Sequence, residues 1–242
     1  MPDEAGRFQT KGLSWSERAK LGGLSAVISP SASARSNAFL GGVHEFGAHH
    51  ALALMDLPAN VVDFGCGNGR FTRFFADRGC TVLGTEITPE MLEDLQSTDR
   101  CRYELTDGVH IPVADGSQDL VWCCGVLRFS MFGEEPQHAN IAAEMFRALR
   151  PGGLVVNVEV FVEEPSTLFV RDFERAGFRV REDKVLHRYG GRFEHHLKDR
   201  RLPDDWMPWL GKRCAQLRYY LDKSNRQPRG LRDYLLVLEK PQ

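Results

Sequence analysis

The sequence has 242 residues, of which 42% are hydrophobic and 26% are charged, with a formal net charge of -2. These values predict one α/β domain of ordinary size with a substantial core, and they exclude disordered, fibrous and uniformly basic proteins. No run approaches the roughly eighteen apolar residues of a membrane span, and residues 1–20 lack the apolar stretch of a secretory signal. We therefore expect a cytoplasmic protein without membrane contact, whose six cysteines form no C-x-x-C pair and are reduced.

The apolar pattern predicts strands that alternate with helices along most of the chain. A leader of about 42 residues, with one short helix at 14–21, precedes a helix at 43–57. Strands are expected at 61–64, 81–86, 102–105, 119–125, 154–161, 178–186 and 234–238. Further helices are expected after the turn at 65–69 and at 88–96, 138–149 and 165–176. This alternation favours a doubly wound, mostly parallel seven-stranded sheet.

The segment between Leu186 and Arg232 differs in charge from the rest of the chain. It carries twelve Lys or Arg and five Asp or Glu, a local net charge of +7, so the remainder carries -9. Aromatic residues such as Trp206 and Tyr219 are interleaved with these charges, and such a mixture binds anionic or aromatic partners through charge and stacking. Three interpretations stay open: a cap over a substrate pocket, a nucleic-acid surface, and a contact between subunits.

A glycine-rich turn after the first core strand predicts a ligand site. Backbone N–H groups of such a turn point beyond the carboxyl end of the strand, where ligands of open α/β sheets bind. The spacing Gly65-x-Gly67-x-Gly69 has Arg70 where a dinucleotide site has its last glycine, and no Gly-Lys-Ser/Thr phosphate loop occurs. Glu86 ends the next strand, where a carboxylate accepts hydrogen bonds from both ribose hydroxyls. The combination indicates a nucleoside-type ligand, whereas the glycines alone also fit a structural tight turn.

The successive motifs of this region resemble those of the class I S-adenosylmethionine-dependent methyltransferases. They occur in the expected order and separation at 61–69, 84–92, 107–113, 119–121 and 149–153. The resemblance extends over about residues 43–180 and the last strand, and it concerns the cofactor fold rather than any substrate. It implies S-adenosyl-L-methionine as the cofactor and S-adenosyl-L-homocysteine as the product.

The resemblance also implies which residues contact the cofactor. They are Asp63, Gly65, Cys66, Gly67, Glu86, Ile87, Met91, Asp107, Gly108 and Cys124. The residues of the glycine loop are expected around the methionine portion, and Glu86 at the ribose hydroxyls. The adenine is expected between Ile87 and Met91, with its amino group at Asp107. Cys124 is expected beside the sulfonium.

The substrate side of the site is less well defined by the sequence. Residues 126–129 stand where the family commonly has an aromatic or histidine pair, and no Asn/Asp-Pro-Pro-Tyr/Phe tetrapeptide occurs, which weighs against amino methylation of a nucleic-acid base. The catalytic residue is not identified, and the candidates are His44, His49, Arg128 and His195, because imidazole accepts a proton near neutral pH. The His-His pairs lack an accompanying ligand set, so no metal site is expected.

The sequence thus predicts four segments: a lid (1–45), an S-adenosylmethionine-binding core (46–186), a basic aromatic insertion (187–231) and the final strand (232–242). The main hypothesis is methyl transfer to a small acceptor, with an anionic group as one option, under the lid and the insertion. The alternatives are an RNA-directed methyltransferase that binds RNA through 187–231, a cofactor-binding module without catalysis, and transfer of a different group. The acceptor atom and the oligomeric state do not follow from the sequence.

Overall fold

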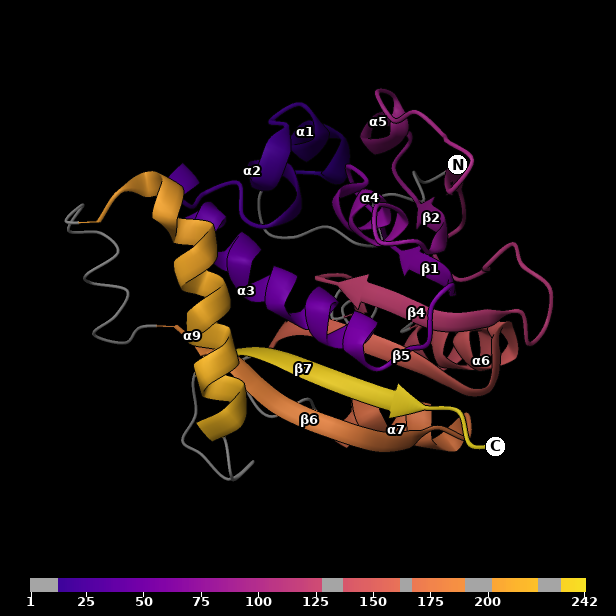
Figure 1. Ribbon diagram of the computed structural model, residues 1–242. Coiled ribbons are helices and arrows are strands. Elements are labelled where there is room, and N and C mark those ends of the chain that lie inside the picture. The colour runs from indigo at the N-terminus through magenta and orange to yellow at the C-terminus, as the bar shows by residue number, and fades with distance from the viewer. Residues whose placement is uncertain (1–12, 128–136, 162–166, 190–201, 222–231) are drawn as a thin grey trace.

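A seven-stranded sheet with helices on both faces forms the centre of the computed structural model (Figure 1). The structure describes residues 13–127, 137–161, 167–189, 202–221 and 232–242. The strand order is β3-β2-β1-β4-β5-β7-β6, and the strands are β1 Asn60–Phe64, β2 Thr81–Glu86, β3 Cys101–Leu105, β4 Gln118–Cys124, β5 Leu149–Phe161, β6 Arg179–Arg188 and β7 Arg232–Glu239. All pairs from β3 to β5 are parallel, and β7 runs antiparallel to both of its neighbours. The predicted mostly parallel, doubly wound sheet is confirmed.

Six of the described helices follow the predicted order, two of them with a clearly different length, and the helices at 23–27 and 207–221 are not among those predicted. The described helices are α1 Trp15–Ala19, α2 Gly23–Val27, α3 Ala34–Ala53, α4 Arg70–Ala76, α5 Pro89–Leu92, α6 His138–Ala148, α7 Thr167–Arg175 and α9 Met207–Leu221, the last preceded by the 3-10 turn η3 Asp204–Trp206. The helix expected at 43–57 begins nine residues earlier, where the Ser33 side chain caps it by accepting from the Ser36 N–H. The helix expected at 88–96 ends at Leu92.

The two faces of the sheet bury alternate residues of each strand in two separate cores. One core joins Val61 and Val156 to side chains of α3, α4 and α9, including Phe39. The other joins Val62 and Val155 to side chains of α6 and α7. Successive side chains of a strand point to opposite faces of the sheet. A strand with helices on both faces therefore needs apolar residues at every position, and its sequence is a continuous apolar run, as in this sheet.

Helices α3 and α9 cross in close contact, and glycines at the crossing permit it. A Cβ atom on Gly42 would lie 1.9 Å from the Pro208 carbonyl oxygen, and one on Gly211 would lie 2.0 Å from the Phe39 carbonyl oxygen. Both distances are far below van der Waals contact, so only glycine fits at either position. Helix α3 also packs against β4 and β5, so this crossing fixes α9 to the sheet through α3 (Figure 1).

The structure can be compared with two features of the predicted segments, the boundary after residue 45 and the basic insertion. The boundary between residues 45 and 46 falls inside the continuous helix α3, so the division into a lid and a core stays a prediction. Within the basic insertion, α9 packs along α3 and against β6, whereas residues 190–201 and 222–231 lie outside the described residues. The proposed contacts of this insertion with RNA or with another subunit also stay predictions.

Two further expectations concern the cysteines and the membrane. All six cysteines are free thiols, four of them buried, which agrees with the expected reduced state. In the described ranges, no helix combines the length and the apolar character that a membrane span needs.

Replacing Gly211 with Ala tests the α3–α9 crossing. The added methyl group meets the α3 backbone, which cannot move without shifting the helix, so we expect a loss of about 1–3 kcal/mol in the free energy of unfolding. Urea denaturation followed by circular dichroism measures this loss. The control is Leu217→Ala on the same helix, because Leu217 is exposed; equal losses in the two variants would contradict the close crossing.

Candidate functional site

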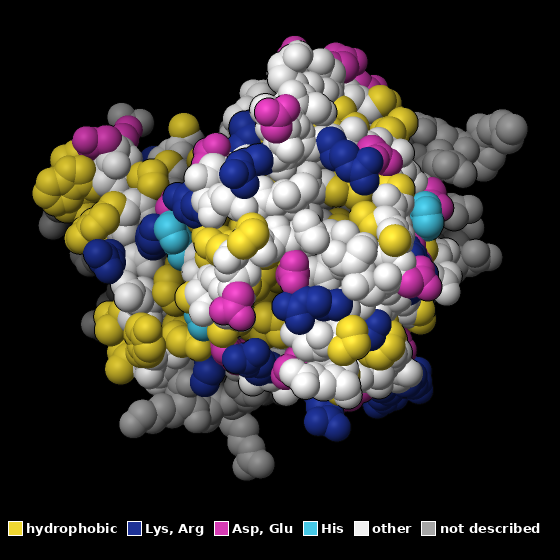
Figure 2. All heavy atoms as spheres, turned by 45° about the vertical axis from the view of Figure 1, so that its right-hand side comes forward, with side chains coloured by type: hydrophobic (Ala, Val, Ile, Leu, Met, Phe, Trp, Pro, Cys, Tyr) yellow, Lys and Arg dark blue, Asp and Glu magenta, His cyan; other side chains and the backbone are white. Residues whose placement is uncertain are grey.

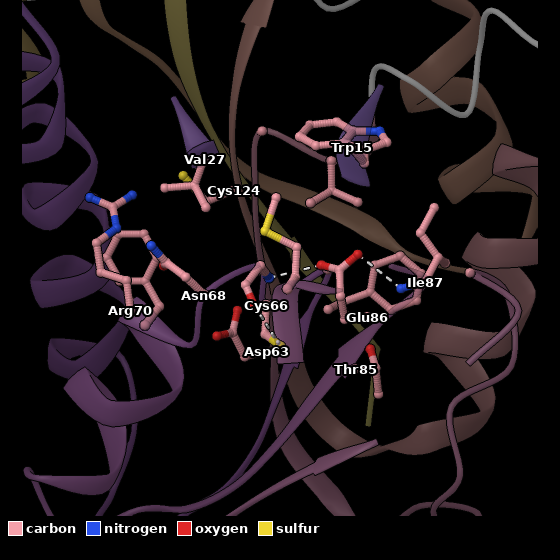
Figure 3. A pocket seen from close by; sticks show the side chains of 18 of the residues that line it. Trp15, Val27, Asp63, Cys66, Asn68, Arg70, Thr85, Glu86, Ile87 and Cys124 are labelled. Atoms are coloured by element: carbon pink, nitrogen blue, oxygen red, sulfur yellow. Dashed lines mark hydrogen bonds between the residues drawn. The ribbon is translucent and has the colours of Figure 1, made fainter. Parts of the chain in front are cut away.

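A cavity that is open to solvent lies at the carboxyl ends of β1, β2 and β4 (Figure 3). Its wall combines apolar side chains with a few polar and charged ones, as small-molecule sites do. The described residues that line the cavity are Trp15, Val27, Asp63, Phe64, Gly65, Cys66, Gly67, Asn68, Arg70, Phe71, Thr85, Glu86, Ile87, Met91, Thr106, Gly108, Cys124, Gly125, Val126 and Ile141. The structure therefore brings the residues predicted to bind the cofactor around one cavity, with the exception of Asp107.

The glycine loop between β1 and α4 adopts a conformation that other residues rarely adopt. Gly65 has φ of 71° and Gly67 has φ of 53°, both in the left-handed region that favours glycine. A Cβ atom at Gly65 would lie 2.5 Å from Val126 Cγ2, and one at Gly67 would lie 2.8 Å from Val27 Cγ1. The two glycines thus keep the loop backbone within reach of the cavity.

Glu86 at the end of β2 is fixed by three backbone N–H groups. Its Oε2 atom accepts from the Gly67 N–H at 2.8 Å, and its Oε1 atom accepts from the N–H groups of Ile87 at 2.9 Å and Thr88 at 3.1 Å. Burial raises the pKa of Glu86, and these donors offset the rise only in part. Because each carboxylate oxygen accepts two hydrogen bonds, Oε1 is fully occupied by these donors, whereas Oε2 retains capacity for one donor from a ligand.

Asp63 at the end of β1 is the second acid in the cavity wall. It is 2% exposed and accepts a hydrogen bond from the Thr72 hydroxyl at 2.7 Å. Burial raises its pKa to about 6, although the Thr72 hydroxyl and Arg70 act in the opposite direction. Burial together with Asp63 also raises the pKa of the Cys66 thiol, so Cys66 remains a neutral part of the wall.

Asp107 does not line the cavity, unlike its neighbours Thr106 and Gly108. Its Oδ1 atom accepts from the N–H groups of Val109 at 2.9 Å and His110 at 2.7 Å. This carboxylate therefore shapes the turn after β3, which brings the neighbouring backbone to the cavity. Its role at the adenine amino group stays a prediction.

Among the catalytic candidates, His44 lies behind the cavity wall rather than in it. It is 6% exposed, and its Nε2 atom lies 3.6 Å from Asp233 Oδ1. The Tyr189 hydroxyl donates to the same oxygen at 3.3 Å. Burial lowers the pKa of His44, but Cys124 and Asp233 outweigh it and raise the pKa to about 10. His44 is therefore a buried imidazolium whose neighbour Cys124 faces the ligand space.

The other catalytic candidates are not in the cavity wall that the structure describes. His49 is half-exposed, with Nε2 3.3 Å from Glu45 Oε1. Burial and the nearby Lys212 lower its pKa. Arg128 and His195 lie outside the described residues.

Sequence reasoning missed several lining residues, above all Trp15, Val27 and Arg70. Trp15 and Val27 come from α1 and α2, and the Asn68 side chain ties the loop to this region by donating to the Gly23 carbonyl at 2.9 Å. Ser14 and Glu17 form a capping box that begins α1, but no local pattern shows that this helix lines the same cavity as the glycine loop. In the sequence, Arg70 stands out only because it occupies the position of the last glycine of a dinucleotide motif.

Comparison with known proteins agrees with this geometry. Residues 62–157 match the methyltransferase domain family. Methyltransferase GfsG from Streptomyces halstedii is 33% identical over 125 residues, 47% of this chain and 43% of the relative. Trans-aconitate 2-methyltransferase from Variovorax paradoxus is 33% identical over 130 residues, 51% of this chain and 48% of the relative. The chain thus spans less than half the length of either curated relative.

A solved structure gives the same result for the fold. A TehB-like SAM-dependent methyltransferase from Corynebacterium glutamicum superposes with a TM-score of 0.55 at 18% identity, over 81% of this chain and 88% of that one. Residues 62–157 of this chain form a methyltransferase domain, and the sheet has the class I methyltransferase fold. The glycine loop lies inside the matched region, and S-adenosylmethionine is the cofactor that this family and fold imply.

The raised pKa of His44 predicts a pH-dependent stability of the methyltransferase domain. The pKa is 6.5 for an ordinary histidine and about 10 in the fold, so the stability from the charged ring is fully present below 6.5 and is lost as pH rises to about 10. The difference in unfolding free energy between the wild type and His44→Asn should therefore shrink by up to about 1.4 kcal/mol per pH unit across this range.

Urea denaturation at several pH values measures that difference. His49→Asn is the matched control, because His49 lies on the same helix and is half-exposed, and its difference should stay nearly constant. A pH-independent difference for His44→Asn would show that the ring is neutral.

Proposed function

We propose that this chain transfers a methyl group from S-adenosylmethionine to a small-molecule acceptor. The observation that carries the proposal is the hydrogen bond from the Gly67 N–H to the Glu86 carboxylate at 2.8 Å, inside the cavity at the strand ends. It fixes a glycine loop and an acid at a strand end side by side, a pair of groups that suits a nucleoside ligand without a phosphate.

The residues of the cavity fit this cofactor. Gly65 and Gly67 form a cradle that a Cβ atom would fill, because such an atom would meet Val126 or Val27. The hydroxyl of Thr85 and the amide oxygen of Asn68 are buried at the cavity without a hydrogen-bond partner in the described part of the chain. Unsatisfied buried polar atoms cost about 1–3 kcal/mol each, which a polar ligand relieves.

The cofactor supplies a methyl group activated by a positively charged sulfur. The chain contributes negative charge through Asp63, whose pKa of about 6 leaves it mostly ionised above neutral pH, and a carboxylate in a low-dielectric wall favours a bound cation. Phe64, Val126 and Ile141 form an apolar part of the wall that excludes water. The remaining task of the protein is to align the acceptor atom, which lowers the barrier through proximity.

Two observations support a small organic molecule as the acceptor. The cavity is concave and mostly apolar with a few polar side chains, as small-molecule sites are, and the relative from Variovorax paradoxus is named as a methyltransferase of trans-aconitate, a small acid. Helices α1 and α2 contribute Trp15 and Val27 to the cavity wall, which supports a lid from the N-terminal segment as part of this proposal.

Isothermal titration calorimetry with S-adenosylmethionine and S-adenosylhomocysteine tests the cofactor part of this proposal. We expect saturable binding of both compounds, because the loop and Glu86 are already in place. No binding at ligand concentrations on the order of millimolar would contradict the proposed function. Transfer of a labelled methyl group to a panel of small acids, phenols and amines then identifies the acceptor class.

Replacing Glu86 with Ala should weaken the binding of S-adenosylhomocysteine by one or two charge-assisted hydrogen bonds, on the order of 2 to 4 kcal/mol. Calorimetry measures the affinity, and circular dichroism shows whether the variant folds. The control is Glu104→Ala on β3, an acid that pairs with Arg102 and does not line the cavity. Unchanged affinity in Glu86→Ala would place the ribose elsewhere.

A further inference from the structure

Arg70 is a cation in the wall of the cofactor cavity. It is the first residue of α4, directly after the glycine loop, and it lines the cavity. Its guanidinium lies 4.1 Å from the centre of the Phe71 ring and reaches the backbone of α3, where a Cβ atom on Gly41 would lie 3.5 Å from Nη1. The side chain therefore bridges the loop and α3 at one side of the cavity.

The charge of Arg70 has no ion-pair partner among the described residues, which contain no carboxylate oxygen within 4.0 Å of it. Its buried Nε–H also lacks a hydrogen-bond acceptor there. Burial lowers the pKa of Arg70, and nearby Cys124 and Asp63 offset this only in part. Arg70 is half-buried and stacks on Phe71, and a partly desolvated cation without an ion-pair partner is stabilised by a bound anion.

Arg147 and Arg18 show how this fold compensates other arginines. Arg147 pairs with Glu144 and Asp115 and also donates to two backbone carbonyls. Arg18, which is 3% exposed, donates to the carbonyls of Ala26 and Ile28. Arg70 lacks such carboxylate and carbonyl partners, and it lines a ligand cavity. We therefore expect a negatively charged group of the ligand to be its partner.

The cavity is polarised between two charged side chains. Figure 3 shows Arg70 on one side, Glu86 on the other, and the glycine loop with Asp63 between them. Among the described lining residues Arg70 is the one cation, so the site matches a singly charged carboxylate better than a doubly charged phosphate. A guanidinium holds a carboxylate by two parallel hydrogen bonds.

We propose that Arg70 is the carboxylate-binding residue of this cavity. This inference rests on the proposed function and adds a second recognition point opposite the ribose-binding Glu86. The carboxylate has two possible sources: the methionine end of the cofactor, or an acid group on the acceptor. Both sources make the same contact with the guanidinium, and binding experiments separate them.

The first arm of the test compares S-adenosylhomocysteine with its decarboxylated analogue, which lacks only the carboxylate. In calorimetry, we expect the wild type to prefer S-adenosylhomocysteine by roughly 10- to 100-fold. Arg70→Met should reduce this preference to about twofold or less, and Arg70→Lys should restore part of it. This result assigns the carboxylate to the cofactor.

The second arm uses malonate as a simple carboxylate probe on protein saturated with S-adenosylhomocysteine. If Arg70 serves the acceptor, the wild type binds malonate, Arg70→Met does not, and the preference in the first arm is unaffected by the substitution. The matched control for both arms is Arg73→Met, an exposed arginine one turn along the same helix that donates to the Asn68 carbonyl.

The proposal is overturned if Arg70→Met changes neither the preference for the carboxylate nor malonate binding. It is also overturned if this variant weakens S-adenosylhomocysteine and its decarboxylated analogue equally and still binds malonate like the wild type, since that pattern reflects packing rather than a carboxylate contact. If neither nucleoside binds the wild type, the proposed function itself fails, so the two failures are distinguishable.

Discussion

The contact between the glycine loop and the end of β2 is the constraint on which the site depends. The Gly67 N–H donates to the Glu86 carboxylate, and the Cys66 N–H donates to the Thr85 carbonyl. These bonds hold two neighbouring parallel strands and the start of α4 in one arrangement. Because the acid is already fixed by backbone donors, a ligand meets it with little loss of conformational entropy, which is the physical basis of preorganised binding.

Helix α3 links this site to the rest of the molecule. Its glycines admit α9 at one crossing, its Gly41 faces the Arg70 guanidinium, and its His44 lies between Asp233 and Cys124. One helix therefore contacts α9, the cavity wall and a buried His–Asp pair. Movements of α3 are expected to affect cofactor binding and the packing of α9 together, because the close backbone contacts transmit displacement.

The charges of the cavity give it two ends with different chemistry. Glu86 and Asp63 offer carboxylates near the loop, and Arg70 offers a cation beside α3. Around them, apolar side chains from β1, the loop after β4 and α6 restrict water. The face of the molecule in Figure 2 mixes both signs of charge with apolar side chains, so the separation of charge inside the cavity has no counterpart on this face.

Local spacing predicts the strand pattern, the glycine loop and the acid at Glu86, because strands lie between helices, glycines occur where φ is positive, and an acid ends a strand. It does not predict the start of α3, which has no clear apolar period and packs closely against α9 at Gly42. The folded arrangement is needed to show that Trp15 and Val27 line the cavity, that His44 lies behind it, and that Arg70 has no ion-pair partner among the described residues. Burial and pairing are properties of contacts between distant segments, and local sequence patterns do not contain them.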